Sequence, residues 1–227
     1  MGFILLGLLA AGAIYKHQKP SGLSTMKQDL DSVQVRQLSL FWSYVVDGMQ
    51  GKQGDTKEPL VLAEEWQLAD PGYATYSNER NQQRLALVLF YFSTGGDFWT
   101  NNTGWLSYDI DECEWFSHSP LDQVCDNEGN YLSLHLDNNN LVGTLTTNIG
   151  LLTTLTYLDI SVNSISSTMP SSFQTLTNLG YFNLAYNTLN GSIPIGLVTE
   201  LTSLRQLGVN NNLLTGTIPS DVANLQR

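Results

Sequence analysis

The chain has 227 residues, of which 42% are hydrophobic and 14% are charged, and its formal net charge is -11. That length allows one or two domains, and the hydrophobic share is enough for a core. The region from Tyr131 onward holds only four acidic and two basic side chains, and the other 17 acidic and 8 basic ones precede it. This nearly neutral second region lacks the basic stripe of a nucleic-acid-binding protein, so no nucleic acid is expected among the partners.

An uninterrupted hydrophobic run from Phe3 to Tyr15 opens the chain, and basic residues up to Lys19 follow it. The run is shorter than the roughly 20 residues that cross a bilayer and fits the apolar part of a signal peptide, with an A-x-A pattern at 11–13. The basic residues after it instead favour an anchor that keeps this flank in the cytoplasm. A buried helix of a soluble protein is a third alternative. We interpret 1–19 as a signal or anchor segment and expect membrane association through residues 3–15.

A polar stretch and a short helix are predicted next. Residues 20–57 are polar and of mixed composition, and we interpret them as a linker or stalk. Residues 58–70 favour a short helix, which ends at the Pro-Gly pair that follows. Leu60, Leu62 and Trp66 are its candidate buried residues.

A stronger helix is predicted over 78–93. Ser77 can cap its first turn, and two consecutive glycines after it end the helix. Its second half is unusually apolar for a surface helix. We therefore expect this helix to cover the open end of a repeated core that begins at Tyr131, whose leucines would otherwise face water.

The segment after this helix holds both cysteines and an aromatic cluster: Phe98, Trp99, Trp105, Cys113, Trp115 and Cys125. In an exported protein the two cysteines would form a disulfide, whereas in the cytosol they would remain free thiols. His118 is the only histidine nearby, which leaves a metal-ligand set incomplete, so no metal is expected. We interpret the aromatic residues as internal packing rather than a ligand site, because tryptophans bury large areas.

From Tyr131 to Arg227 one pattern, LxxLxLxxNxLxGxIP, returns four times with occasional substitutions, and its asparagines are spaced 24, 24 and 25 residues apart. The alternating apolar residues predict a short strand whose leucines point inward. The asparagine amide can bond backbone groups that strand pairing leaves free, and the Gly and Ile-Pro that follow suit an irregular return. One such strand buries too little by itself, so the copies must stack into one continuous core.

The repeated pattern resembles the plant-type leucine-rich repeat, whose second half is visible at Ile193-Pro194 and Ile218-Pro219. This resemblance implies an α/β repeat fold, a leucine-rich-repeat solenoid with short parallel strands on the concave face. Residues 131–227 would form four such repeats. Because no capping segment follows the last copy, we expect a truncation at the C-terminus.

The aromatic segment, with Gly96-Asp97-Phe98-Trp99, Gly104-Trp105 and a Cys-x-Trp, is similar to the N-terminal cap of plant-type and algal leucine-rich-repeat surface proteins. In that family a helix, tryptophans and a disulfide close the first repeat. The resemblance implies a helical, disulfide-linked cap over 58–130. The gap between the Cys-x-Trp and the second cysteine is longer than the family's, so we expect a loop around 118–123 to protrude.

The outward positions of the predicted strands form rows across the concave face. Stacking the copies gives one row of Ser133, Tyr157, Tyr181 and Gln206, a second of His135, Asp159, Asn183 and Gly208, and a third of Asn138, Val162, Tyr186 and Asn211. Tyrosines mixed with acid and amide groups suit a protein, peptide or glycan ligand. The alternative is that the tyrosines are simply good strand formers. The candidate ligand-binding residues are His135, Tyr157, Asp159, Tyr181, Asn183, Tyr186 and Gln206.

No nucleophile accompanies His135 and Asp159, and kinase signatures are absent, so neither catalysis nor a cofactor is expected. We expect a recognition module at the cell surface or secreted, which binds a protein, peptide or glycan. The alternatives are a secreted inhibitor of a wall-degrading enzyme, as some relatives with this repeat are, and a structural or adhesion role. Asn101 and Asn190 begin sequons that permit glycosylation of an exported chain.

Overall fold

The computed structural model describes residues 58–118, 123–217 and 219, which belong to one compact unit. The predicted signal or anchor segment, the linker, most of the protruding loop and the end of the fourth repeat lie outside these residues. Within the described part, every helix is too short or too polar to span a membrane.

Two helices, α4 (Pro59–Ala69) and α5 (Asn78–Ser93), open the described chain. The predicted bounds of α5 are confirmed, and the Ser77 hydroxyl accepts a hydrogen bond from the backbone N–H of Arg80 at 3.2 Å. The predicted burial in α4 is confirmed for Trp66 but wrong for Leu60, which is 45% exposed, while Leu62 is half-buried. Leu60 lies in the first turn of α4, and full burial begins only at Ala63.

The rest of the cap contains two short 3-10 helices, η1 (Gly96–Phe98) and η2 (Glu112–Glu114), and a disulfide between Cys113 and Cys125, as the resemblance implied. The three tryptophans of this segment are buried, and each indole N–H donates to a backbone carbonyl. Internal packing is therefore confirmed for these tryptophans. Phe98 differs, because it ends η1 with its side chain 76% exposed while its neighbour Trp99 turns inward.

A cluster of buried charges joins the cap helices. Arg84, only 1% exposed, donates from Nε to Asp70 at 3.0 Å and from a terminal nitrogen to Glu112, itself fully buried. Its guanidinium carbon also lies 5.0 Å from the centre of the Trp66 ring and 5.4 Å from that of Trp115. Buried charges of this kind persist only where they are paired, so this cluster holds α4, α5 and η2 in one arrangement.

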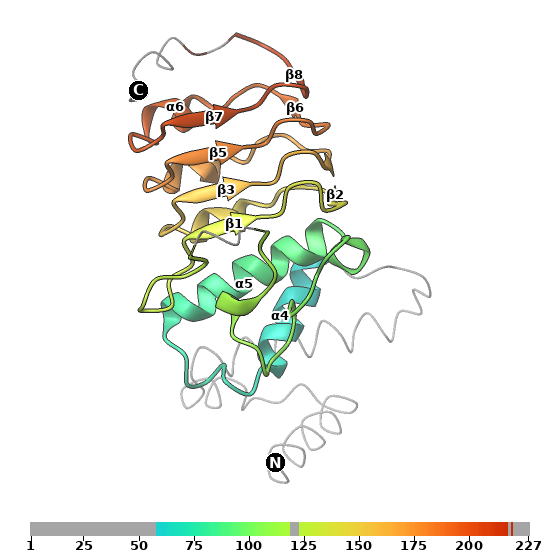
Figure 1. The fold of residues 1–227 in the computed structure, drawn as a ribbon, viewed down its shortest axis with the longest axis vertical. Coiled ribbons are helices and arrows are strands. Elements are labelled where there is room, and N and C mark those ends of the chain that lie inside the picture. The colour runs from blue at the N-terminus through green and yellow to red at the C-terminus, as the bar shows by residue number, and fades with distance from the viewer. Residues whose placement is uncertain (1–57, 119–122, 218, 220–227) are drawn as a thin grey trace, which may run out of the picture. The chain divides into compact units, whose positions relative to one another are not determined.

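The repeats form a solenoid around one core (Figure 1). A four-stranded parallel sheet in the order β1-β3-β5-β7 covers one face, as predicted. Its strands are β1 (Ser133–His135), β3 (Tyr157–Asp159), β5 (Tyr181–Asn183) and β7 (Gln206–Gly208). Two smaller parallel sheets pair β2 (Val142–Gly143) with β4 (Ser164–Ile165) and β6 (Asn190–Gly191) with β8 (Leu213–Leu214). The return segments are η3 (Thr147–Leu151), η4 (Ser171–Thr175) and α6 (Ile195–Thr199).

Repeat asparagines perform the role predicted for them. Asn187 is buried; its side-chain oxygen accepts from the N–H of Ile165 at 3.0 Å, and its amide nitrogen donates to the carbonyls of Ile160 at 2.9 Å and Leu184 at 3.2 Å. Asn163 makes equivalent bonds one repeat earlier. Each asparagine therefore links its own repeat to its neighbour by satisfying backbone groups inside the coil.

The helix α5 covers the first repeat, as expected. The N–H groups of Val142 and Thr144 donate to the carbonyls of Thr94 and Ser93, both at 3.0 Å. Gly143 between them has φ 137°, and a Cβ there would lie 2.1 Å from the Ser93 carbonyl oxygen. Only glycine permits this close approach, so the cap and the array are joined through backbone at this point.

Candidate functional site

The strand register confirms the two rows predicted for the strands. Ser133 pairs with Tyr157, Tyr157 with Tyr181, and Tyr181 with Gln206. Two residues further along, His135, Asp159, Asn183 and Gly208 stand in the same order. The 24-residue spacing therefore brings side chains that are far apart in sequence into adjacent positions on one face.

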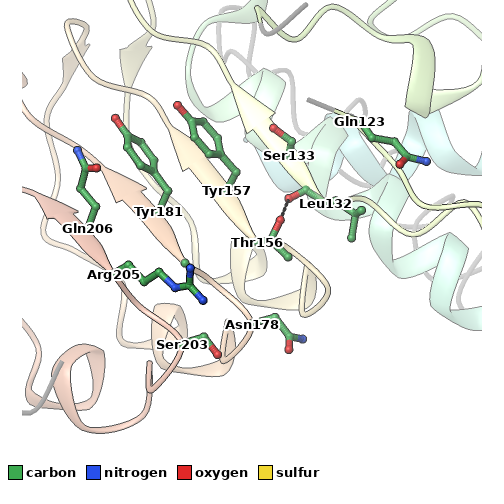
Figure 2. A pocket seen from close by; sticks show the side chains of 11 residues that line it. Gln123, Leu132, Ser133, Thr156, Tyr157, Asn178, Tyr181, Ser203, Arg205 and Gln206 are labelled. Atoms are coloured by element: carbon green, nitrogen blue, oxygen red, sulfur yellow. Dashed lines mark hydrogen bonds between the residues drawn. The ribbon is translucent and has the colours of Figure 1, made fainter. Parts of the chain in front are cut away.

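Four aromatic rings follow one another across this face, and we call them the aromatic ladder: His118, His135, Tyr157 and Tyr181. Successive ring centres lie 5.6, 5.3 and 4.3 Å apart. The two tyrosine rings are nearly parallel, with 5° between their planes, and Figure 2 shows them rising side by side from β3 and β5. Rings held in this way present a pre-ordered, amphipathic surface with little conformational freedom left to lose on binding.

Asp159 was predicted to face a ligand, but it is only 5% exposed. Its carboxylate accepts hydrogen bonds from the N–H and the hydroxyl of Ser161, at 2.9 and 2.6 Å, and from Tyr181 and Asn183, at 3.2 and 3.1 Å. Burial and then this carboxylate raise the pKa of Tyr181. These four donors occupy the lone pairs of the Asp159 carboxylate. Asp159 therefore holds Tyr181 and Asn183 in place and does not face a ligand itself.

Two histidines share one carboxylate at the cap end of the ladder. Nδ1 of His118 lies 3.0 Å and Nε2 of His135 lies 2.9 Å from the same oxygen of Asp137. Asp137 was not among the predicted site residues. The alternation of outward positions could have found it, since it lies two residues beyond His135 in the same strand direction.

The third predicted row occupies the turns that follow the strands. Asn138, Val162, Tyr186 and Asn211 all have left-handed backbone conformations, with φ between 49° and 56°. Tyr186 is 57% exposed there. This row therefore borders the sheet at the carboxyl ends of its strands and does not belong to the strands themselves.

A groove of about 590 Å³ lies at the opposite border, where the strands begin (Figure 2). The tyrosines of the ladder and Gln206 form one side of it, and Ser133 and Thr156 lie at its cap end. Arg205, which the sequence analysis did not single out, contributes its exposed side chain. A signal for Arg205 was available in the sequence, since it is the only lysine or arginine between Tyr131 and Gln226.

The two sequons lie away from the rows. Asn101 is half-buried, and its side-chain oxygen accepts from the N–H and hydroxyl of Thr103, at 3.0 and 2.8 Å. Asn190 is exposed in β6, in one of the two-stranded sheets. Glycosylation stays a prediction for both. Within the described residues, acidic, histidine and cysteine side chains form no group of three that could hold a metal ion.

Comparison with known proteins agrees with this geometry. The family model described as leucine rich repeat matches residues 153–214. The solved structure of pollen receptor kinase 3 is similar in fold, with a TM-score of 0.51 and 24% identity over 61% of this chain and 64% of that one. Among curated proteins, none matches the chain.

Two further solved structures are similar to the repeats. One is the BIR3–SERK2 complex from Arabidopsis thaliana, with 32% identity and a TM-score of 0.47 over 53% of this chain and 63% of that chain. The other is the plant peptide hormone receptor RGFR1 in complex with RGF2, with 42% identity and a TM-score of 0.41 over 42% of this chain. The chain spans only 15% of the length of that receptor chain.

Short parallel strands, the asparagine positions and a helical, disulfide-linked cap define a leucine-rich-repeat solenoid. The family match over residues 153–214 and the Ile-Pro second half of the repeats agree with the predicted kind of repeat. The described repeats are therefore leucine-rich repeats that resemble the plant type.

Proposed function

We propose that this chain is a non-catalytic recognition module that binds a protein, peptide or glycan on its concave face, at the cell surface or after secretion. The observation that carries the proposal is the aromatic ladder, which runs beside an open groove on a rigid sheet. Exposed aromatic side chains in fixed positions are the usual anchors of binding surfaces.

The order of this surface supports binding over a merely structural role. Tyr181 and Asn183 are fixed by Asp159, and His135 is fixed by Asp137. Strand-forming tyrosines would need no such polar contacts to contribute to the sheet. A surface that is ordered before a ligand arrives binds with less entropic cost.

Alanine replacement of both Tyr157 and Tyr181 tests the proposal. The full chain would be exposed to an array of cell-wall oligosaccharides and to a library of synthetic peptides. We expect at least one probe to bind, and its affinity to fall about tenfold or more in the double variant, as for anchor residues elsewhere. Ile195→Ala serves as the control, because Ile195 is a large apolar side chain, 58% exposed, that lies on the return segment α6. Equal binding by the double variant and the control would support adhesion or scaffolding instead.

Location at the cell surface or secretion has a separate test. Expression in a secretory host, followed by mass spectrometry of the N-terminus with and without deglycosylation, distinguishes the alternatives. A start near Ile14 with sugar on Asn101 or Asn190 indicates a cleaved signal and a secreted product. An intact Met1 in the membrane fraction indicates an anchor, and an intact, soluble chain without sugar contradicts export.

A further inference from the structure

Arg205 is unusual in its surroundings. It is the only lysine or arginine among the described repeat residues, in a chain whose net charge is -11. It is exposed, and within the described residues no carboxylate lies close enough to form an ion pair with it. Its backbone is nevertheless fixed, because its N–H donates to the carbonyl of Gly180 at 2.8 Å. The backbone at Arg205 is therefore fixed, and its exposed guanidinium has no ion-pair partner among the described residues.

The other charges of the repeat face do not compete for this cation. Asp159 is occupied by four hydrogen-bond donors, and Asp137 lies against the two histidines at the cap end. The groove side chains that the structure describes include no carboxylate at all. A planar guanidinium with no acid of its own is suited to bind a carboxylate through two parallel hydrogen bonds.

The remaining lining of the groove indicates what carries that carboxylate. Thr156, Asn178, Ser203 and Gln206 offer hydroxyl and amide groups, and Leu132 is the only aliphatic side chain. Figure 2 shows Arg205 on the side of the groove where Asn178 and Ser203 lie, with Tyr157 and Tyr181 rising beside it. Hydroxyls and amides both donate and accept, which suits the closely spaced hydroxyls of a sugar. Apart from Leu132 and the two tyrosines, the described side chains of the groove are polar, which favours a sugar over the apolar anchors of a peptide.

The charge balance limits how acidic the ligand can be. One cation stands in the groove, and the chain as a whole is strongly acidic, so a polyanion would be repelled. The volume of about 590 Å³ lies within the range of roughly 300–1,000 Å³ that is typical of small-ligand sites. A short oligosaccharide with a single acidic unit fits both observations.

We propose that this groove binds a short, otherwise neutral oligosaccharide that carries one uronic-acid carboxylate. The Arg205 guanidinium binds the carboxylate, the amide and hydroxyl side chains bind sugar hydroxyls, and the two tyrosines of the ladder border the sugar rings. This inference rests on the proposed recognition function and names the ligand class for the same face.

Gly180 offers a way to block the groove without disturbing the fold. It lies on the groove floor, between Thr156 and Ser203, and its φ is not in the left-handed region. A Cβ built there would meet the carbonyl oxygens of these two residues at 3.7 Å, an ordinary contact distance. Gly180→Leu therefore places a side chain in the groove at little cost in strain.

The test is calorimetric titration of the full chain with matched sugars. The probes are tetrasaccharides of glucose, galactose and mannose whose terminal unit is oxidised to a uronic acid, each with its methyl ester and its neutral counterpart. We expect one acid to bind about tenfold or more tightly than its ester and its neutral counterpart, as for a charged hydrogen-bonded pair. Arg205→Gln should remove that preference, Arg205→Lys should restore part of it, and Gly180→Leu should abolish binding.

Several results would overturn the proposal. These are equal affinity for acid and neutral sugars, a preference for the acid that survives Arg205→Gln, and no binding of any of the sugars. If the sugars fail while a peptide from the library binds and loses affinity in the Tyr157 and Tyr181 double variant, recognition by this face stands and only the ligand class is wrong. If neither sugars nor peptides bind, both proposals fail.

Discussion

In the cap, residues 58–130, the contacts that hold the structure occur once each: one arginine between two buried carboxylates, one disulfide, and tryptophans whose N–H groups each have one acceptor. In the repeats, each contact occurs in several copies. Asn163, Asn187 and Asn212 make the same bonds one repeat apart, and the first three repeats each add a buried Leu, Ile or Phe pair to the core at β1, β3 and β5.

This difference predicts how each region responds to damage. A contact that occurs once has no equivalent nearby to replace it, so substitutions at a few positions of the cap should lower stability strongly. Stability of a repeat array is closer to a sum over repeats and their interfaces, so one lost contact should cost less there. The four-stranded sheet depends on both the cap and the repeats, because α5 covers the end of the repeat core beneath β1 (Figure 1).

The largest effect is expected from Arg84→Met. This change leaves the buried carboxylate of Asp70 without its cation, while Glu112 loses one of two arginines and keeps Arg80, and breaking a buried pair costs roughly 3–5 kcal/mol. Urea unfolding followed by tryptophan fluorescence measures the change in free energy of unfolding. The control is Arg205→Gln, an exposed position without an ion pair, for which we expect a change within about 0.5 kcal/mol. Equal effects of the two variants would show that the charge cluster contributes nothing.

Removal of the disulfide is expected to rank second. The double variant Cys113→Ser and Cys125→Ser removes a disulfide between residues 12 apart in sequence. A disulfide that closes a loop of this size contributes about 3 kcal/mol to the free energy of unfolding. Hydrogen exchange should show lost protection in α5 and η2, with amides of β3 and β5 less affected. Uniform loss of protection across both regions would contradict the separation between cap and repeats.

A smaller effect is expected from Asn187→Ala in the middle of the array. It removes the acceptor for Ile165 and the donor for Ile160, which leaves buried backbone groups unpaired at about 1–3 kcal/mol. Asn178→Ala is the matched control, because its amide bonds the Thr153 carbonyl at the exposed surface. Urea unfolding measures the free energy of unfolding of both variants. If Asn187→Ala lowers it as much as Arg84→Met does, the repeats are as sensitive to a single lost contact as the cap is.

The smallest effect concerns alkaline pH. Burial, followed by the hydrogen bond to Asp97, raises the pKa of Tyr91 to about 12, above the value of about 10 in an unfolded chain. Between about pH 10 and about pH 12 the unfolded chain has lost the Tyr91 proton that the folded chain keeps. The free energy of unfolding therefore falls as pH rises from about 10 to about 12, and the contribution of Tyr91 does not change with pH below about 10.

The midpoint of thermal unfolding between pH 9 and 12 measures this dependence. Tyr91→Phe should give a shallower decline over that interval, whatever its stability at neutral pH. An unchanged slope would show that Tyr91 ionises equally in both states.

The periodic part of the molecule was predictable in detail. The spacing of the asparagines gave the register of the strands, and therefore the pairing of Tyr157 with Tyr181 and of Asp159 with Asn183. The capping serine and the glycines after α5 marked its ends correctly. These features depend on residues that are close in sequence or on the persistent repeat, so patterns in the sequence can predict them.

The fate of individual polar side chains was not predictable in the same way. Asp159 and His135 occupy equivalent positions in neighbouring repeats, yet Asp159 is buried under its own hydrogen bonds while His135 contacts Asp137. Arg84 belongs to a helix where an arginine would ordinarily face water. Tyr181 and Asn183 reach Asp159 from the next strand, and the carboxylates at Arg84 come from outside its helix, so a local pattern could not reveal these contacts.

The sequence by itself determined the solenoid, its register and the identity of the outward rows, because an inexact but persistent period leaves one way to bury every leucine. Only the tertiary structure decided which of those outward residues are engaged with one another and which face a groove. Burial of polar groups depends on partners brought together across repeats and from the cap. That is why the sharing of Asp137 by His118 and His135, and the place of Arg205 in a groove, emerged only once the chain was folded.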